Sequence, residues 1–216
     1  MLKKNCLRIT EIFSSIQGET SKVGLPTVFI RLTGCPLRCH YCDTSYAFNG
    51  GELMQLEAIV QKVKELGFKD VCVTGGEPLA QDGTKNLLKE LVDLGFEVSL
   101  ETGGSISIAG IDESVKIIMD IKSPDSGEVA NNIWENIELL KVSDELKIVI
   151  CSREDYLWSR GIINQYHINE KCQILLSPCS ETLEPRKLAE WILEDHVPVR
   201  FQMQIHKILW NNQPGK

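Results

Sequence analysis

VFIRLTGCPLRCHYCDT, residues 28–44, sets the architecture of this chain. Its first part, 28–34, is rich in β-branched and aromatic residues and stops at a glycine, which predicts a strand. The segment that follows carries Cys35, Cys39 and Cys42 at offsets of four and three. Gly34 and Pro36 favour a loop there over the start of a helix. A strand therefore leads directly into a loop that brings three thiols close together.

Apolar runs and helix-periodic segments alternate along the rest of the chain. Further strands are predicted at 71–74, 97–102, 115–121, 145–150, 173–178 and 199–205, and helices at 56–67, 84–95, 131–141, 154–166 and 186–195. Apolar strands separated by helices indicate a parallel sheet with helices on at least one face. The units are fewer than the eight of a closed barrel. We predict one α/β domain over residues 1–216, an open, partial (β/α) barrel of six or seven mostly parallel strands.

Composition excludes several classes of function. The chain has 216 residues, of which 43% are hydrophobic and 25% charged, and its net charge is −7. An acidic chain is a poor general binder of nucleic acid, and we find no apolar stretch long enough for a membrane span. The first residues hold two lysines without an apolar run behind them, which argues against a secretory signal. We expect a soluble cytoplasmic protein without nucleic-acid or membrane partners.

Eight cysteines are many for this length. Disulfides are the least expected use in a reducing compartment. Five are scattered and are interpreted as structural thiols: Cys6, Cys72, Cys151, Cys172 and Cys179.

The three clustered cysteines have two metal interpretations. Iron–sulfur clusters are normally held by four cysteines, so three would leave one iron open to an outside ligand. A zinc ion is the alternative, with His40 or Asp43 as fourth ligand. A purely structural role is the third possibility. We predict a [4Fe–4S] cluster on Cys35, Cys39 and Cys42, because His40 would have to fold back on its neighbours to reach zinc.

Other polar and glycine-rich segments follow the next strands. They are Gly75–Pro78, Thr102–Gly104 and Lys122–Pro124. Ligands of parallel sheets bind at the carboxyl edge of the strands, so these segments and the cysteine loop are expected to share one site.

The cysteine spacing after a strand, with Tyr41 before the last cysteine, resembles the radical S-adenosylmethionine (SAM) superfamily. Thr74-Gly75-Gly76-Glu77-Pro78 is similar to its second signature, although such a turn alone could be only a turn. The resemblance implies that SAM chelates the open iron and is cleaved to a 5′-deoxyadenosyl radical. It implies cofactor contacts at Tyr41, Asp43, Gly75, Gly76 and Glu77. Lys122 and Ser123 are expected in reach of a cofactor carboxylate or ribose.

Further segments resemble the 7-carboxy-7-deazaguanine synthase family. They are Ser15–Glu19, Phe29–Cys35, Cys42–Thr44, Glu101–Gly104, Asp120–Pro124 and His206–Asn211. The resemblance implies conversion of 6-carboxy-5,6,7,8-tetrahydropterin to 7-carboxy-7-deazaguanine with loss of ammonia, on the route to queuosine, with SAM regenerated. It further implies a homodimer, a flavodoxin or ferredoxin as electron donor, and Thr44 as a Mg²⁺ ligand. No catalytic side chain is expected beyond the cluster and the SAM radical.

The expected substrate contacts follow from its flat, polar, carboxylated ring. They are Ile16, Gln17, Gly18, Glu19, Arg31, Thr74 and His206. A guanidinium such as that of Arg31 suits a carboxylate, although an ion pair at a strand end is the alternative. A turn role for Gln17 and Glu19, and a packing role for His206, also stay open. Glu101 and Lys147 are expected in salt bridges.

Two features of the sequence depart from the family pattern, and two alternative functions remain to be considered. Residues 45–54 form a short loop after the cysteines, and the few helices leave part of the sheet edge for a dimer partner to cover. A glycyl-radical activase is one alternative, although Asp43-Thr44 stands where such enzymes commonly carry His-Asn. A metal module that displays its loop to another macromolecule is the other, but an α/β frame of this size is large for that purpose.

Overall fold

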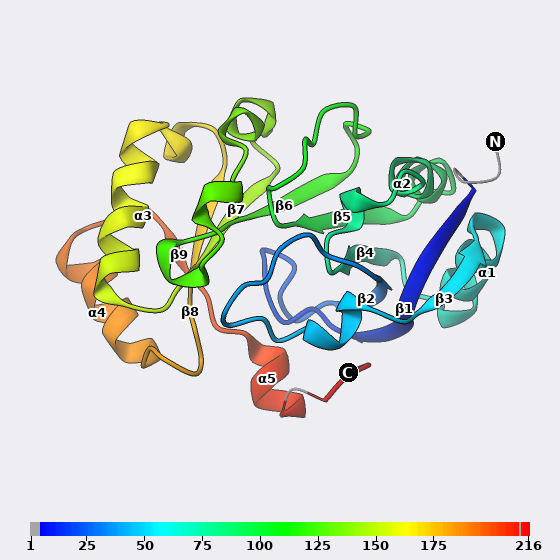
Figure 1. Ribbon diagram of the computed structural model, residues 1–216, viewed down its shortest axis with the longest axis horizontal. Coiled ribbons are helices and arrows are strands. Elements are labelled where there is room, and N and C mark those ends of the chain that lie inside the picture. Colours follow the sequence, from blue (N-terminus) through cyan, green and yellow to red (C-terminus); the bar gives the residue numbers. More distant parts are fainter. Residues whose placement is uncertain (1–4, 212) are drawn as a thin grey trace.

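A mixed sheet is the frame of the protein in the computed structural model, which describes residues 5–211 and 213–216 (Figure 1). Residues 1–4, including the lysines weighed against a secretory signal, lie outside the described part. The strands are β1 (Cys6–Ile16), β2 (Pro26–Leu32), β3 (Glu52–Gln55), β4 (Asp70–Gly75), β5 (Glu97–Thr102), β6 (Lys116–Ile121), β7 (Glu145–Ile150), β8 (Gln173–Pro178) and β9 (Arg200–Phe201). Their order is β3-β1-β2-β4-β5-β6-β7-β8-β9.

Parallel pairing runs from β2 through β4 to β9, which confirms the predicted open and mostly parallel sheet. β1 and β3 extend it on one side by antiparallel pairing and were not predicted. β1 was not predicted because polar residues such as Arg8, Thr10 and Glu11 disturb the alternation of apolar and polar side chains that indicates a strand.

The helices are α1 (Leu56–Leu66), α2 (Thr84–Asp93), α3 (Arg153–Gln165), α4 (Pro185–Glu194) and α5 (Ile205–Trp210). α1 ends at Gly67, whose φ of 76° suits a residue without a side chain. α3 begins where the Ser152 hydroxyl accepts a hydrogen bond from Asp155 N at 3.2 Å. In Figure 1, α1 and α2 lie toward the β1 end of the sheet and α3 and α4 toward the β9 end.

Two predicted elements are wrong. The helix expected at 131–141 consists instead of short 3₁₀ turns, Val129–Asn131 and Trp134–Leu139. Asn132 bonds both backbone groups of Lys122, and Asn136 bonds the backbone of Gly104, Ile106 and Ile108. These side-chain bonds to distant loops replace a regular helix. The strand expected at 199–205 shrinks to Arg200–Phe201, and its end enters α5.

The hydrophobic core lies on one face of the sheet. Val73, Leu100 and Ile117 are in register across β4, β5 and β6, and each is buried on this face. α1 and α2 cover the face at one end, and α3 and α4 cover it at the other. Cys72 and Cys172 are buried thiols, as predicted for structural cysteines. In the described residues we find no helix with the length and hydropathy to cross a membrane.

Candidate functional site

The pleat of the strands turns a row of polar side chains to the face opposite the core. Arg31, Thr74, Glu101, Asp120 and Lys147 alternate with the buried residues of β2, β4, β5, β6 and β7. Arg31 pairs in register with Thr74, and Asp120 with Lys147. Since successive side chains of a strand point to opposite faces, this row lies over the sheet near its carboxyl edge. The predicted common edge is therefore present.

A cavity of about 260 Å³ lies above this row. The rest of its wall includes the cysteine loop, residues 15–19 at the end of β1, residues 179–181, and α5 with the residues that follow it. It brings together sixteen predicted site residues: Ile16, Gln17, Gly18, Glu19, Arg31, Cys35, Cys39, Tyr41, Cys42, Asp43, Thr44, Thr74, Gly75, Gly76, Lys122 and His206. Glu77 and Ser123 are not in its lining.

The cysteine loop suits an iron–sulfur cluster better than a single metal ion. Cys35, Cys39 and Cys42 are free thiols that all line the cavity. In the described residues, no three His, Cys, Asp or Glu side chains converge closely enough for one metal ion. A cluster binds each thiolate to a different iron, so its ligands stand further apart than those of zinc.

Both candidate zinc ligands have other partners. His40 Nδ1 is 3.1 Å from the carbonyl oxygen of Asp125. Asp43 forms an ion pair with Lys207 at 2.8 Å and accepts a hydrogen bond from the Thr44 hydroxyl at 2.9 Å. Burial opposes ionisation of Asp43, but Lys207 outweighs it and lowers the Asp43 pKa to about 2. With His40 and Asp43 engaged elsewhere, the donors that fit a metal group here are the three thiols, in line with the cluster interpretation.

Gly75 and Gly76 allow the loop after β4 to lie against the cysteine loop. A side-chain carbon on Gly76 would stand 2.2 Å from the carbonyl oxygen of Gly34 and 2.8 Å from Cβ of Cys35. One on Gly75, whose φ is 147°, would stand 2.3 Å from the oxygen of Leu32. Both contacts are shorter than atoms tolerate. The glycine-rich signature thus packs two backbones together in addition to lining the cavity.

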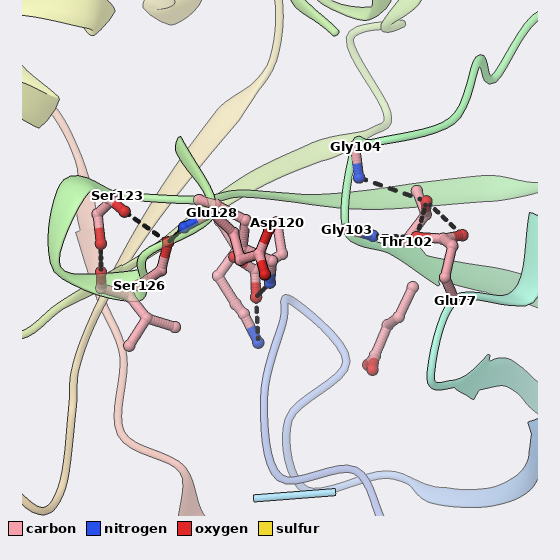
Figure 2. A network of polar contacts seen from close by, with 12 residues as sticks. Glu77, Thr102, Gly103, Gly104, Asp120, Ser123, Ser126 and Glu128 are labelled. Atoms are coloured by element: carbon pink, nitrogen blue, oxygen red, sulfur yellow. Dashed lines mark hydrogen bonds and ion pairs between the residues drawn. The ribbon is translucent and has the colours of Figure 1, made fainter. Parts of the chain in front are cut away.

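Glu77 and Ser123 hold loops in place (Figure 2). The Glu77 carboxylate accepts hydrogen bonds from Thr102 Oγ1 at 2.9 Å and from the Gly103 and Leu79 amides at 2.7 and 3.0 Å. Burial raises the Glu77 pKa, although these donors oppose the rise. Ser123 Oγ donates to the Val149 carbonyl at 2.9 Å and lies 3.0 Å from Asp155 Oδ2. Their side chains tie the ends of β4 and β5, and of β6 and β7, to one another.

A buried charge network forms one wall. Lys147 Nζ lies 2.5 Å from Glu19 Oε2 and 3.7 Å from Asp120 Oδ2, and Lys122 Nζ lies 3.2 Å from the same Asp120 oxygen. Burial opposes the charged forms of Glu19 and Lys147. The positive charge of Lys147 nevertheless lowers the Glu19 pKa, and the negative charges of Glu19 and Asp120 raise the Lys147 pKa. The salt bridge expected at Lys147 is confirmed. Glu101 instead accepts a hydrogen bond from Thr74 Oγ1 at 3.0 Å.

Arg31 is positioned by an ion pair and faces the cavity. Its Nε lies 2.7 Å from Glu11 Oε1, which also accepts a hydrogen bond from the Tyr46 hydroxyl at 2.8 Å. The ion pair is the structural alternative considered for Arg31. It uses Nε and leaves the two terminal nitrogens of the guanidinium for other acceptors. Arg31 can therefore hold its ion pair with Glu11 and still offer guanidinium nitrogens to a ligand carboxylate.

His206 packs against the segment after β1. A side-chain carbon on Gly18 would stand 2.2 Å from His206 Nδ1, and Ile205 N donates to the Gly18 carbonyl at 3.1 Å. Gln204, the residue before α5, also reaches this wall, since its Nε2 lies 2.6 Å from Glu19 Oε1. Burial lowers the His206 pKa, although Glu19 opposes it. The lowered pKa favours the neutral form of the ring.

Several lining residues were not predicted as ligand contacts. Asp120, Glu101, Gln204, Lys207 and the segment 179–181 all face the cavity. A charged residue inside an apolar strand, such as Asp120 in IIMDIK, is the signal that could have found it. Gln204 and Lys207 depend on the path of α5, which the misassigned strand concealed.

Comparisons with known proteins agree with this geometry. Residues 29–126 match the family model of the radical SAM superfamily. The chain is 46% identical to the 7-carboxy-7-deazaguanine synthase of Chlorobaculum tepidum, over 95% of this chain and 94% of that protein. It is 37% identical to the protein of the same name from Koribacter versatilis, over 94% and 97% of the two chains. Its fold matches the crystal structure of QueE from Escherichia coli with a TM-score of 0.77 at 23% identity, over 92% and 94% of the two chains.

Substitution of Gly76 by alanine should displace the cysteine loop. The added carbon meets backbone atoms that cannot rotate away, so we expect a loss of about 1–3 kcal/mol in the free energy of unfolding and reduced iron uptake. Gly161→Ala is the matched control, because this helical glycine has open space around its Cα. Iron and sulfide are measured after anaerobic reconstitution. Equal iron content in the two variants would contradict the role of this contact.

Proposed function

The chain belongs to the 7-carboxy-7-deazaguanine synthase family of radical SAM enzymes, and from this premise we propose that it converts 6-carboxy-5,6,7,8-tetrahydropterin to 7-carboxy-7-deazaguanine with release of ammonia. A radical SAM enzyme uses a [4Fe–4S] cluster and SAM. The observation that carries the proposal is the cavity itself, where three free thiols face a buried wall of alternating charges. Such a wall suits a polar ring with many donors and acceptors, as a pterin has.

Cys35, Cys39 and Cys42 would hold the cluster. When bound there, the cluster together with SAM would supply one-electron radical chemistry. We assign the backbone and side chains nearest the thiols, at Tyr41, Asp43, Gly75, Gly76 and Lys122, to the cofactor. Glu77 and Ser123 act as positioning residues, because their side chains bind neighbouring loops.

The opposite part of the cavity would bind the substrate. The free guanidinium nitrogens of Arg31 suit its carboxylate, since such pairs form two parallel hydrogen bonds. Gln17 and Glu19, with Ile16 and Gly18, would receive the pyrimidine edge of the ring, and Thr74 and His206 would border it. Glu19 is held by Lys147 and Gln204, so its carboxylate is fixed before the ligand arrives. Fixed acceptors of this kind orient a ring without further loss of side-chain freedom.

The reaction itself is the first test. Cluster-loaded protein is incubated anaerobically with SAM, dithionite, Mg²⁺ and the carboxylated tetrahydropterin, and the products are identified by mass spectrometry. We expect 7-carboxy-7-deazaguanine, with SAM not consumed in proportion. Formation of 5′-deoxyadenosine without this product would overturn the substrate and favour an activase. Cys39→Ala is the matched control: it should lose cluster and turnover, and full turnover in this variant would contradict the cluster assignment.

We infer a Mg²⁺ ion at Thr44. The hydroxyl of Thr44 lines the cavity and bonds Asp43 at 2.9 Å, and Mg²⁺ binds few protein oxygens while keeping water and substrate oxygens. Thr44→Ala should raise the Mg²⁺ concentration needed for half-maximal rate by about tenfold or more, whereas Thr44→Ser should keep it. Initial rates over a Mg²⁺ series test this. The same Mg²⁺ dependence in both variants would remove Thr44 from the metal site.

We further propose a cytoplasmic homodimer that accepts electrons from a flavodoxin or ferredoxin. The eight free thiols suit a reducing compartment. Exposed Leu53 on β3, and exposed Ile208 and Leu209 on α5, supply apolar surface for a partner copy. Sedimentation equilibrium of the cluster-loaded protein should give twice the chain mass. A monomer mass at micromolar concentration would contradict the dimer.

A further inference from the structure

Cys151 and Cys179 stand side by side where β7 and β8 end. Ile150 and Pro178 are the last residues paired in register, and each cysteine is the next residue of its strand. Cys179 N continues the ladder by donating to the Ile150 carbonyl at 2.8 Å. Neighbouring strands lie about 4.7–4.9 Å apart, which falls within the Cα separation of about 4.4–6.8 Å that disulfides span. The backbone therefore already has the spacing of a disulfide.

The two thiols interact directly and differ in character. Both are free, and the Cys151 thiol donates a hydrogen bond to the sulfur of Cys179. This bond, together with burial, raises the Cys151 pKa. The same bond lowers the Cys179 pKa against the effect of burial, with help from the backbone and hydroxyl of Thr182. The Cys179 sulfur is thus the more readily ionised of the two, with the Cys151 thiol beside it.

One member of the pair, Cys179, belongs to the cavity wall, and neither cysteine belongs to the cysteine loop. Cys179 lines the cavity together with Ser180, Glu181 and Val149. Cys151 N donates to Asp155 Oδ2 at 3.1 Å, the same oxygen that Ser123 Oγ contacts at 3.0 Å. A change at these sulfurs therefore reaches both the wall and the loop that follows β6.

We propose that Cys151 and Cys179 are a redox-active dithiol that a low-molecular-weight disulfide converts into an intramolecular disulfide. The Cys179 thiolate attacks one sulfur of the small disulfide, forms a mixed disulfide and expels one thiolate. The Cys151 sulfur then loses its proton and attacks the Cys179 sulfur, which expels the second thiolate. The protein loses two electrons and two protons, and the small disulfide gains them as two thiols.

Closure of the bridge draws the two sulfurs to about 2.05 Å and so shifts the wall at Cys179 to Glu181. Because this wall borders the cavity, we expect the oxidised protein to bind SAM more weakly. This consequence rests on the proposed function, whereas formation of the bridge does not.

The bridge is tested without turnover. Cluster-loaded protein is incubated anaerobically with oxidised glutathione, the remaining thiols are alkylated with N-ethylmaleimide, and peptides are mapped by mass spectrometry. We expect a Cys151–Cys179 cross-linked peptide, lighter by two hydrogens than its separate parts and released by dithiothreitol. Cys6→Ser, on β1 and far along the sheet from β7 and β8, is the control that should still form it, while Cys151→Ser should yield only a glutathione adduct at Cys179. Glutathione adducts alone in the wild type, or bridges to Cys35, Cys39 or Cys42, would overturn the proposal.

The effect on ligand binding is measured separately by equilibrium dialysis of SAM. The affinity should fall on oxidation in the wild type and in Cys6→Ser, and should be restored by dithiothreitol. If oxidised wild type forms the bridge yet binds SAM as the reduced protein does, the role of the bridge in ligand binding is wrong. If the reduced protein binds no SAM, the proposed function fails, and the mapped disulfide stands by itself.

Discussion

The contact between the backbones of two loops underlies the rest of the site. Gly76 N donates to the Leu32 carbonyl at 3.1 Å, and Glu77 N donates to the Gly34 carbonyl at 2.8 Å. These bonds continue the β2–β4 ladder beyond the strands, into the residues that precede Cys35. Only glycine fits at position 76, because any side chain would enter the Gly34 peptide. The cysteine loop is consequently fixed at its root by a sheet, and its thiols need little further ordering before a cluster binds.

A second constraint comes from charge. Glu19, Asp120, Lys122 and Lys147 would each be costly to bury alone, and they are tolerable only because opposite charges alternate at distances of 2.5–3.7 Å. Removing Lys147 would take the ion pair from Glu19, and removing Asp120 would take it from Lys122, so the network holds the side chains in one arrangement. A cavity with fixed donors and acceptors distinguishes polar ligands more sharply than an apolar one does, because a wrong ligand leaves buried groups without partners. The network therefore connects stability with specificity.

The sequence predicted the parallel sheet, the edge at which the candidate site lies and sixteen of the residues that line the cavity, because these depend on local pattern. Apolar strands, helical periodicity and the loop of Cys35, Cys39 and Cys42 are visible within short windows. What it missed depends on distant contacts. The 129–139 segment follows from side-chain bonds of Asn132 and Asn136 to other loops, and Gln204 enters the site only because α5 turns back toward Gly18. Glu77 and Ser123 follow predicted strands, but their side chains bond to neighbouring loops. The direction of these side chains cannot be predicted from the local sequence.

Segments from the two ends of the described chain complete the cavity wall above the central strands. The strands from β2 to β7 supply the floor and the cysteine loop, but residues 15–19 and α5 complete the wall through Ile205 N to Gly18 O, Gln204 to Glu19 and Lys207 to Asp43. These contacts join segments nearly two hundred residues apart, such as Glu19 and Gln204. Contacts between residues this far apart in the sequence carry a greater loop-closure cost than local ones. The cavity wall therefore depends on both ends of the described chain, whereas the root of the cysteine loop is held by β2 and β4, and its middle by residues 125–128. The cysteine loop and the substrate side of the cavity thus depend on largely different contacts, and the Asp43–Lys207 ion pair is where α5 joins the two.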